Sequence, residues 1–213
     1  MRGGALLRRL VAEGEHVHQD FKFSISDARK IARSISAFAN NDGGRLLIGV
    51  KDNGVIAGVR NEEDIFVVEQ AAERYCRPAQ NVVFKAYRLE GTTRVIVAEI
   101  SRAQERPVMV DEGQGRYKAY YRVADENICA HPLMVRSWEM EAAGSCAPLS
   151  ERHYAMAALF DTPGKMLDER AVALALHLPQ AVADDMIARL AAAGIIAFAF
   201  DGTAFRLTLA ENQ

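Results

Sequence analysis

Residues 40–58 read NNDGGRLLIGVKDNGVIAG, and this stretch decides how the rest of the chain is interpreted. The Asn and Gly residues at 40–44 accept the left-handed backbone with which a helix ends. The run Leu46–Val50 is almost wholly apolar, which is typical of a strand buried on both faces. Asp52-Asn53-Gly54 is a tight-turn signal, after which we expect residues 55–59 to return as a partner strand.

The flanking segments extend this pattern into a mixed sheet. Upstream, Ile31, Ile35 and Phe38 recur at helical spacing behind a serine that can cap the helix. The elements expected downstream are a helix at 62–75 and strand pairs at 82–89 with 92–100 and at 107–110 with 117–123. This order predicts an α+β fold with a mixed α/β sheet, rather than a doubly wound parallel sheet.

The residues after 143 predict a different pattern of secondary-structure elements. Residues 144–150 carry Gly, Ser, Ala and Pro, which is typical of a linker. Helices are expected at 151–160, 168–177 and 181–193, and a hairpin at 195–200 with 203–209. Three helices followed by a hairpin is the layout of a winged helix. We therefore expect an α/β domain at 1–143, a linker at 144–150 and a winged-helix-like domain at 151–213.

Charge is distributed unevenly between these parts. The chain has 26 Lys and Arg residues and 28 Asp and Glu residues, a formal net charge of −2. Residues 1–143 hold 21 basic and 20 acidic residues (net +1), and residues 144–213 hold 5 and 8 (net −3). Dedicated nucleic-acid binders are often strongly basic, so a contact with phosphates would rest on a local patch in the first part. The helix at 181–193 presents Asp184 and Asp185, which favours dimerisation or partner docking over base reading.

No segment predicts secretion or a membrane span. The three cysteines, Cys76, Cys129 and Cys146, form no CxxC pair, which fits a reducing cytosol. The longest apolar runs are far shorter than the roughly 20 residues that span a bilayer, and the first residues contain no apolar signal region. We expect a cytoplasmic protein without a membrane partner.

Several short motifs follow one another in a fixed order. They are Phe21-Lys22, Ile35-x-Ala37-Phe38-Ala39-Asn40, Gly43-Gly44-x-Leu46-Leu47-Ile48-Gly49-Val50-x-Asp52-x-Gly54-x-Ile56-x-Gly58, Arg106-Pro107 and Ala119-Tyr120-Tyr121-Arg122-Val123. Together they resemble the Schlafen AlbA domain. The resemblance implies an α/β nucleic-acid-binding domain, and bacterial members are often described as transcriptional regulators. Two positions depart from the family pattern: Asp20 replaces a glutamate before the Phe-Lys pair, and Ala124 replaces a glycine after Arg-Val.

The resemblance also implies a catalytic alternative, because animal members include metal-dependent RNases with three carboxylates. The matching positions here are Glu15, Asp20 and Asp52. Carboxylates that converge on Mg²⁺ or Mn²⁺ can polarise a phosphodiester and activate a water. Glu15 and Asp20 are five residues apart, so a regular strand would place them on opposite faces unless the chain bends between them. The alternative is that both are surface charges and that Asp52 is a turn residue.

Basic residues supply candidates for contact with phosphates. Lys22, Arg29, Lys30 and Arg33 lie on or just before the helix that precedes Asn40 and can form a local patch. Arg122, in the last motif, is a further candidate. The alternative for the helix residues is an ordinary solvated face.

Three functions remain open from the sequence. The first is a DNA- or RNA-binding protein, in its most concrete form a bacterial transcription-associated regulator whose C-terminal module forms a homodimer or docks a partner. The second is a Mg²⁺- or Mn²⁺-dependent endoribonuclease, and the third is a protein-interaction scaffold. No GxxxxGK[ST] motif is present, so a Walker-type ATPase is not predicted.

Overall fold

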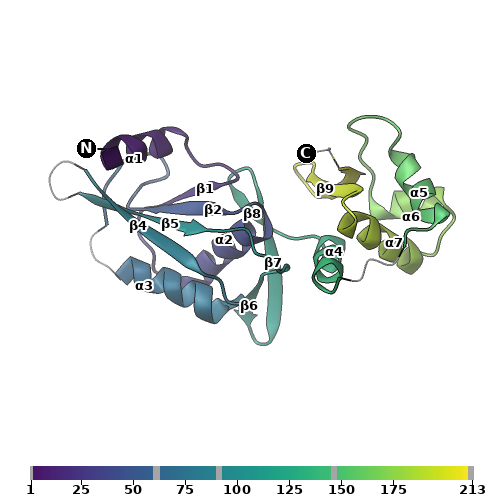
Figure 1. Ribbon diagram of the computed structural model, residues 1–213, viewed down its shortest axis with the longest axis horizontal. Helices are drawn as coiled ribbons and strands as arrows, with labels where there is room; N and C mark the ends of the chain where they lie inside the picture. The colour runs from purple at the N-terminus through teal and green to yellow at the C-terminus, as the bar shows by residue number, and fades with distance from the viewer. Residues whose placement is uncertain (1, 60–62, 90–92, 145–147, 211–213) are drawn as a thin grey trace. The chain divides into compact units, whose positions relative to one another are not determined.

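The computed structural model describes residues 2–59, 63–89, 93–144 and 148–210 (Figure 1). They belong to two compact units, Met1–Ala130 (unit 1) and His131–Gln213 (unit 2). Unit 1 combines helices with two sheets, and unit 2 is mainly helical with a hairpin. The α+β architecture predicted from the sequence is confirmed.

Unit 1 is built on a four-stranded sheet with the strand order β1-β2-β5-β4. Its strands are β1 (Gln19–Lys22), β2 (Gly44–Ile48), β4 (Val82–Arg88) and β5 (Arg94–Ile100). β1 runs parallel to β2, and the other neighbours are antiparallel. Because side chains alternate along a strand, Leu46 and Ile48 face one core cluster and Leu47 faces another. The sheet is therefore buried on both faces, as the apolar run predicts.

Helices cover both faces of this sheet (Figure 1). α1 (Arg2–Ala12) packs Leu7 and Leu10 against one face. α2 (Ala28–Asn40), α3 (Glu63–Gln70) and a π-helical turn at Ala71–Tyr75 cover the other. The cap of α2 is Asp27 rather than a serine, and its carboxylate accepts the backbone N–H groups of Arg29 and Lys30.

A second four-stranded antiparallel sheet, with the order β3-β6-β7-β8, packs on the other side of α2. Its strands are β3 (Cys76–Arg77), β6 (Met109–Gly113), β7 (Arg116–Val123) and β8 (Glu126–Cys129). The core cluster that contains Phe38 of α2 also includes Ile96 of the first sheet and Val110 of the second. α2 is thus the central element of unit 1, with apolar contacts on two sides.

The returning strand expected at 55–59 is not formed. Val50 and Ile56 meet only in an isolated bridge, and β5 pairs with β2 instead. The backbone of Gly58 crosses over Gly49, where a Cβ would lie 2.7 Å from the Gly58 carbonyl carbon. Gly49 has a φ of 97°, which favours glycine. The glycines of this motif therefore permit a backbone crossing rather than a hairpin.

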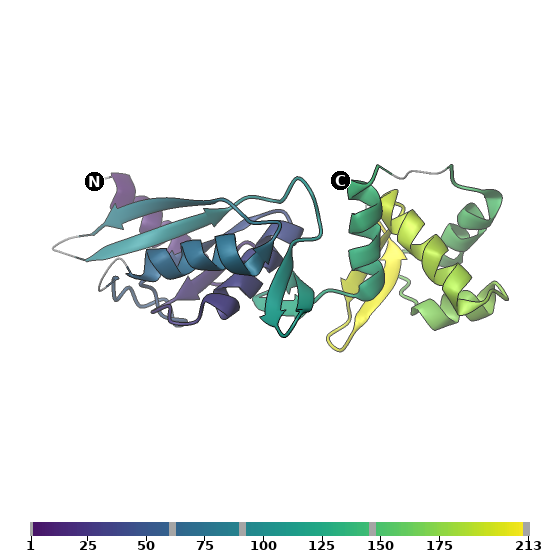
Figure 2. The same cartoon turned by 90° about the horizontal axis from the view of Figure 1, so that it is seen from below.

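Unit 2 begins earlier than the sequence predicts. Its helices are α4 (Pro132–Ala142), α5 (Glu151–Ala157) with a 3-10 turn at Ala158–Phe160, α6 (Glu169–Ala175) and α7 (Gln180–Ala192). α4 lies beside α7 in both views (Figures 1 and 2), and Leu133 joins the core of unit 2. The boundary at 143 was therefore wrong, because the residues before the expected linker already pack on the second unit.

The three helices and the hairpin expected after residue 150 are all present. The hairpin consists of β9 (Ile196–Phe200) and β10 (Phe205–Leu209), and Leu167 bridges to Leu207 on the far side of β10. The winged-helix assignment of this module stays a prediction. Among the described helices none is by itself long and apolar enough to cross a bilayer, although α6 and α7 meet these criteria as a bent pair.

Candidate nucleic-acid interface

Glu15 and Asp20 come together because the chain turns sharply between them. His16 and Gln19 exchange backbone hydrogen bonds of 2.9 and 3.0 Å, which closes the turn directly before β1. Oε1 of Glu15 then accepts the N–H of Phe21 at 2.9 Å. This turn supplies the bend without which the two carboxyl groups would lie on opposite faces.

The two carboxyl groups influence each other's pKa. Burial, followed by the hydrogen bond to Asp20, raises the pKa of Glu15 above its ordinary value. Burial also acts to raise the pKa of Asp20, but the hydrogen bond from Glu15 and the charges of Lys22 and Arg122 outweigh it, so that this pKa is lowered. The environment thus moves the two pKa values apart, that of Glu15 upward and that of Asp20 downward.

Cations already neutralise Asp20. Lys22 Nζ lies 2.7 Å from Asp20 Oδ2 and also donates to the Phe21 carbonyl at 2.8 Å. The guanidinium of Arg122 lies 3.4 Å from Asp20 Oδ1. Lys22 is therefore held by its own strand, and its charge is opposed by a carboxylate 2.7 Å away.

The metal site implied by the resemblance does not fit these residues. Asp52 is exposed in the turn after β2, whereas the strand register pairs Asp20 with Leu46. Across the described ranges, no three His, Cys, Asp or Glu side chains converge in a way that could hold a metal ion. The described residues therefore do not form the three-carboxylate site: Glu15 and Asp20 meet, but Asp52 does not join them in a metal-binding group, and two cations lie beside Asp20.

Arg122 was wrong as a candidate for phosphate contact, because its side chain is buried. Its guanidinium donates to Asn127 Oδ1 at 2.9 Å and to the Gln19 carbonyl at 3.3 Å. It also lies over the ring of Phe38, 5.2 Å from the ring centroid. Arg122 therefore ties β7 to β1 and to α2, and no surface is left for a ligand.

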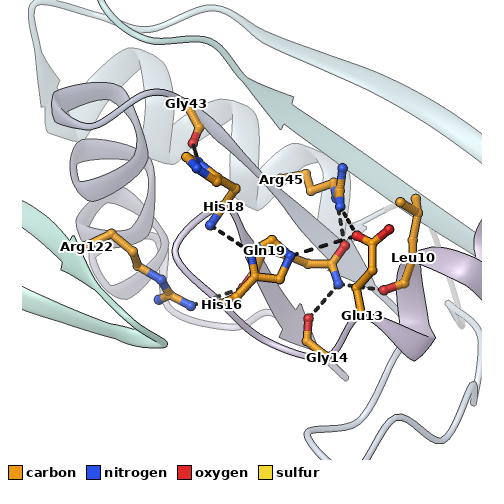
Figure 3. Close-up of polar contacts among 9 residues, drawn as sticks. All are labelled: Leu10, Glu13, Gly14, His16, His18, Gln19, Gly43, Arg45 and Arg122. Atoms are coloured by element: carbon orange, nitrogen blue, oxygen red, sulfur yellow. Dashed lines mark hydrogen bonds and ion pairs between the residues drawn. The ribbon is translucent and has the colours of Figure 1, made fainter. Parts of the chain in front are cut away.

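Gln19 organises the same corner of unit 1 (Figure 3). Its side chain is fully buried, and Nε2 donates to the carbonyls of Leu10 and Gly14, each at 2.6 Å. Its Oε1 accepts from Arg45 Nε at 2.6 Å, and Arg45 also pairs with Glu13. These contacts fix the chain between α1 and β1. The sequence offered no signal for this role, because a glutamine in a short strand is unremarkable by itself.

Asn40 and Asn41 do more than end α2. Asn40 donates to the carbonyls of Val108 and Tyr120 at 3.0 Å each, and its Oδ1 accepts the N–H of Val108 at 2.7 Å. Asn41 forms a reciprocal pair of 3.0 Å bonds with the backbone of Arg122. The two asparagines therefore join α2 to β7 and to the segment before β6, which explains why the motif carries two amides.

Four cations from α2 and β7 form the candidate interface, which we call the α2–β7 surface. Its members are Arg29, Lys30, Arg33 and Lys118. Arg29 lies over the ring of Tyr75, 5.2 Å from its centroid, and against the backbone of Gly113. Lys30 and Lys118 are exposed, and no ion pair involves either within the described part of the chain.

Two carboxylates reduce the charge of this surface: Glu112, and Asp27 at the start of α2, whose charge also acts on Arg33. Arg33 binds Glu112 through Nε and Nη2, at 2.8 and 2.5 Å, and Tyr120 donates its hydroxyl to Glu112 at 2.6 Å. The hydrogen bond from Arg33 is the main reason why the pKa of Glu112 is lowered, and the charge of Lys118 contributes further. Lys118 is therefore close enough to act together with Arg33, and the surface remains positive overall.

The third helix of unit 2 presents little to a nucleic acid. Ala183, Met186, Ile187, Ala188 and Leu190 of α7 are buried, and only its first turn is well exposed. Asp185 pairs with Arg136 of α4 and with Arg189. With α4 packed beside it, α7 lacks the open polar face with which a recognition helix reads base edges.

Two of the solved structures that resemble this chain show the extent of the similarity. The DIP2311 protein from Corynebacterium diphtheriae is 21% identical with a TM-score of 0.44, over 75% of this chain and 34% of that one. The N-terminal domain of a protein related to the ATP-dependent DNA helicase RecG, from Nitrosomonas europaea, is 20% identical with a TM-score of 0.40, over 59% and 95%. This chain thus spans about a third of the Corynebacterium protein. No curated protein matches it.

Residues 15–130 match the family described as Schlafen, AlbA_2. The match ends at the boundary of unit 1, at Ala130. It includes the turn before β1, the Asn40–Asn41 contacts and the buried Arg122. The chain belongs to the Schlafen AlbA_2 family.

Proposed function

We propose that unit 1 binds the phosphate backbone of DNA or RNA through the α2–β7 surface. The observation that carries the proposal is the grouping of Arg29, Lys30, Arg33 and Lys118, four cations near which the described residues place the carboxylates of Glu112 and Asp27. Guanidinium and ammonium groups supply most of the affinity of proteins for nucleic-acid backbones. Membership in the AlbA_2 family supports a nucleic-acid-associated role.

Rigid placement of two of these cations supports the same conclusion. Arg29 is held by Tyr75 and Gly113, and Arg33 by Glu112 and Tyr120. Side chains ordered in advance lose less conformational entropy when they bind. Lys30 and Lys118 would then add flexible contacts at the rim.

In its most concrete form, the proposal is a cytoplasmic, transcription-associated regulator that acts as a homodimer. Unit 1 would supply the affinity for nucleic acid, and unit 2 would supply the contact between copies. The burial of α7 supports this division, because a covered helix is poorly placed to read bases.

The proposal is tested by gel electrophoresis of the purified chain with labelled single-stranded RNA and with duplex DNA. Each mixture is run once in EDTA and once in Mn²⁺. We expect a shift in both buffers that weakens steeply with salt, and intact nucleic acid throughout. Asp20→Asn changes no residue of the α2–β7 surface and serves as a control, once far-UV circular dichroism has shown that it keeps the fold despite its buried pair with Arg122. Cleavage in Mn²⁺ that is lost in Asp20→Asn would contradict the proposal in favour of a nuclease, and no shift at low salt would contradict both.

A further inference from the structure

Among the described strands, none pairs with the outer side of β9, which is an edge strand. It pairs with β10, which in turn bridges to Leu167, so the order across this small sheet is Leu167, β10, β9. The sequence of β9 is Ile-Ala-Phe-Ala-Phe, with no charged residue. Exposed edges of this kind are templates for pairing with another chain.

The hydrogen-bond pattern shows which backbone groups of β9 point outward. Leu207 exchanges both of its backbone bonds with Leu167, at 3.0 and 2.8 Å. Backbone groups alternate in direction along a strand, so Arg206 and Thr208 bond toward β9, where they face Ala199 and Ala197. The N–H and C=O groups of Ile196, Phe198 and Phe200 therefore point to the open edge, and within the described residues none of them has a backbone partner there.

The other sheet edges of the chain carry charges. Among the described strands, the edge strands β1, β3, β4 and β8 contain Asp20 and Lys22, Arg77, Lys85 and Arg88, and Glu126 respectively. Charged side chains on an edge protect it against pairing. β9 lacks this protection, which is expected where pairing is part of the assembly.

We propose that β9 pairs with the β9 of a second copy of the chain, in antiparallel register about a two-fold axis at Phe198. This register places the outward groups of Phe198 opposite those of the second Phe198, and Ile196 opposite Phe200. Ala197 then lies opposite Ala199 of the other copy, as a close non-hydrogen-bonded pair. The two small sheets become one continuous sheet across the dimer.

The absence of charge on β9 favours a second copy over a charged partner. The strand offers no ion pair to an acidic or basic peptide and no cation to a nucleic acid, whereas a second β9 matches it without repulsion. The strand is also self-complementary, as an interface across a two-fold axis requires. The pairing rests on the homodimer proposed for unit 2 and names its surface, and it does not depend on the nucleic-acid binding proposed for unit 1.

Light scattering of the full chain, at concentrations up to about 100 µM, tests the pairing. We expect a mass of twice the 23.4 kDa of one chain. In Ala197→Lys/Ala199→Lys, each lysine faces a lysine of the other copy, and the Kd of the dimer should rise by about tenfold or more. The fluorescence of Trp138, the single tryptophan of the chain, reports whether unit 2 remains folded.

The matched control is Thr208→Lys. Together with Arg206, it places two cations on the sheet face that carries Ala197 and Ala199, but on β10 rather than on the edge strand β9. We expect it to remain dimeric. Thr208 also lines a groove of 670 Å³ between the hairpin and residues 160–164. A dimer that Thr208→Lys dissociates would place the contact in that groove and overturn the proposal, as would a monomeric wild type.

Disulfide formation tests the register independently. In a Cys129→Ser/Cys146→Ser background, an oxidised mixture of Ala197→Cys and Ala199→Cys chains should form a covalent heterodimer. Directly opposed non-hydrogen-bonded positions have the Cα separation that a disulfide requires. Either variant alone should crosslink much less. Equal crosslinking in the mixture and in the single variants would contradict the proposed register.

Discussion

The guanidinium of Arg122 lies 3.4 Å from Oδ1 of Asp20, and the two side chains are only 1% and 5% exposed. The pair joins β7 in one sheet to β1 in the other. Charges taken this far out of water are retained only when they are paired and hydrogen-bonded. The residues that suggested a catalytic and a phosphate-binding role therefore hold the two sheets of unit 1 together.

Removing Arg122 should strongly destabilise unit 1. We expect Arg122→Met to lower the free energy of unfolding by about 3–5 kcal/mol, because it leaves a buried carboxylate with fewer opposing charges. Urea unfolding followed by far-UV circular dichroism measures the loss. Trp138 lies in unit 2, so its fluorescence transition should stay unchanged. A loss under about 1 kcal/mol would show that Arg122 is a peripheral contact.

Ala124 occupies a backbone position that favours glycine. It has a φ of 50° in the turn between β7 and β8. A left-handed conformation disfavours L-residues with a Cβ by roughly 1–2 kcal/mol. We expect Ala124→Gly to raise the free energy of unfolding of unit 1 by about 1 kcal/mol in the same measurement. No change, or a loss, would show that the turn tolerates the Cβ without strain.

The opposite pKa shifts of Glu15 and Asp20 predict an unusual response of stability to pH. The pKa of Glu15 is raised above its ordinary 4.5, so the folded state binds this proton more tightly than the unfolded chain. The resulting stabilisation is complete below pH 4.5 and is lost as the pH rises through the raised pKa. Asp20 acts in the opposite sense: its pKa is lowered below 3.8, and its contribution is lost as the pH falls through that lowered value.

A glutamine at position 15 separates these two effects. It keeps a permanent donor toward Asp20 and an acceptor for the N–H of Phe21. We expect Glu15→Gln to have a higher Tm than wild type at pH 7, with a gap that shrinks below pH 4.5. Thermal unfolding followed by circular dichroism at the two pH values gives the comparison. A gap that does not depend on pH would mean that Glu15 holds no extra proton.

Glu112 should weaken nucleic-acid binding by neutralising Arg33. We expect Glu112→Gln to bind duplex DNA more tightly, with a salt dependence steeper by about 0.9 in the log–log slope, because one more cation is available. The amide keeps an acceptor for Tyr120. Glu99→Gln, which frees Lys85 on a different strand, is the matched control. An equal gain in affinity for DNA in both variants would show that net charge, rather than the α2–β7 surface, is responsible.

The sequence predicts the elements of this fold better than their contacts. The apolar run at 46–50 and the helix before it are found as expected, since both follow from periodicity. In the sequence, the end of a helix is enough to account for Asn40 and Asn41. Nothing therefore predicted their hydrogen bonds to the backbone of the second sheet. Long-range hydrogen bonds leave no periodic trace in a sequence.

The candidate site was predicted less well, for reasons that lie in particular residues. Arg122 was named as a further candidate for phosphate contact, although alternation along β7 places it on the same side as Tyr120, which faces α2. The turn at 16–19 contains no glycine or proline, so the meeting of Glu15 and Asp20 could not be foreseen. The tertiary structure decides which partner a charged side chain finds, so the sequence alone does not predict it. The exposure of Lys30 could be predicted, because it follows from helical spacing alone.

Fluorescence anisotropy with labelled duplex DNA across a salt series tests the central claim most directly. The chain should bind at low salt with a Kd that rises steeply as salt increases. Lys30→Gln/Lys118→Gln should reduce the log–log slope by about 1.8, which corresponds to two lost phosphate contacts, and Lys165→Gln in unit 2 should leave it unchanged. A wild type that does not bind at low salt, or a slope that is the same in all three proteins, would contradict binding through the α2–β7 surface.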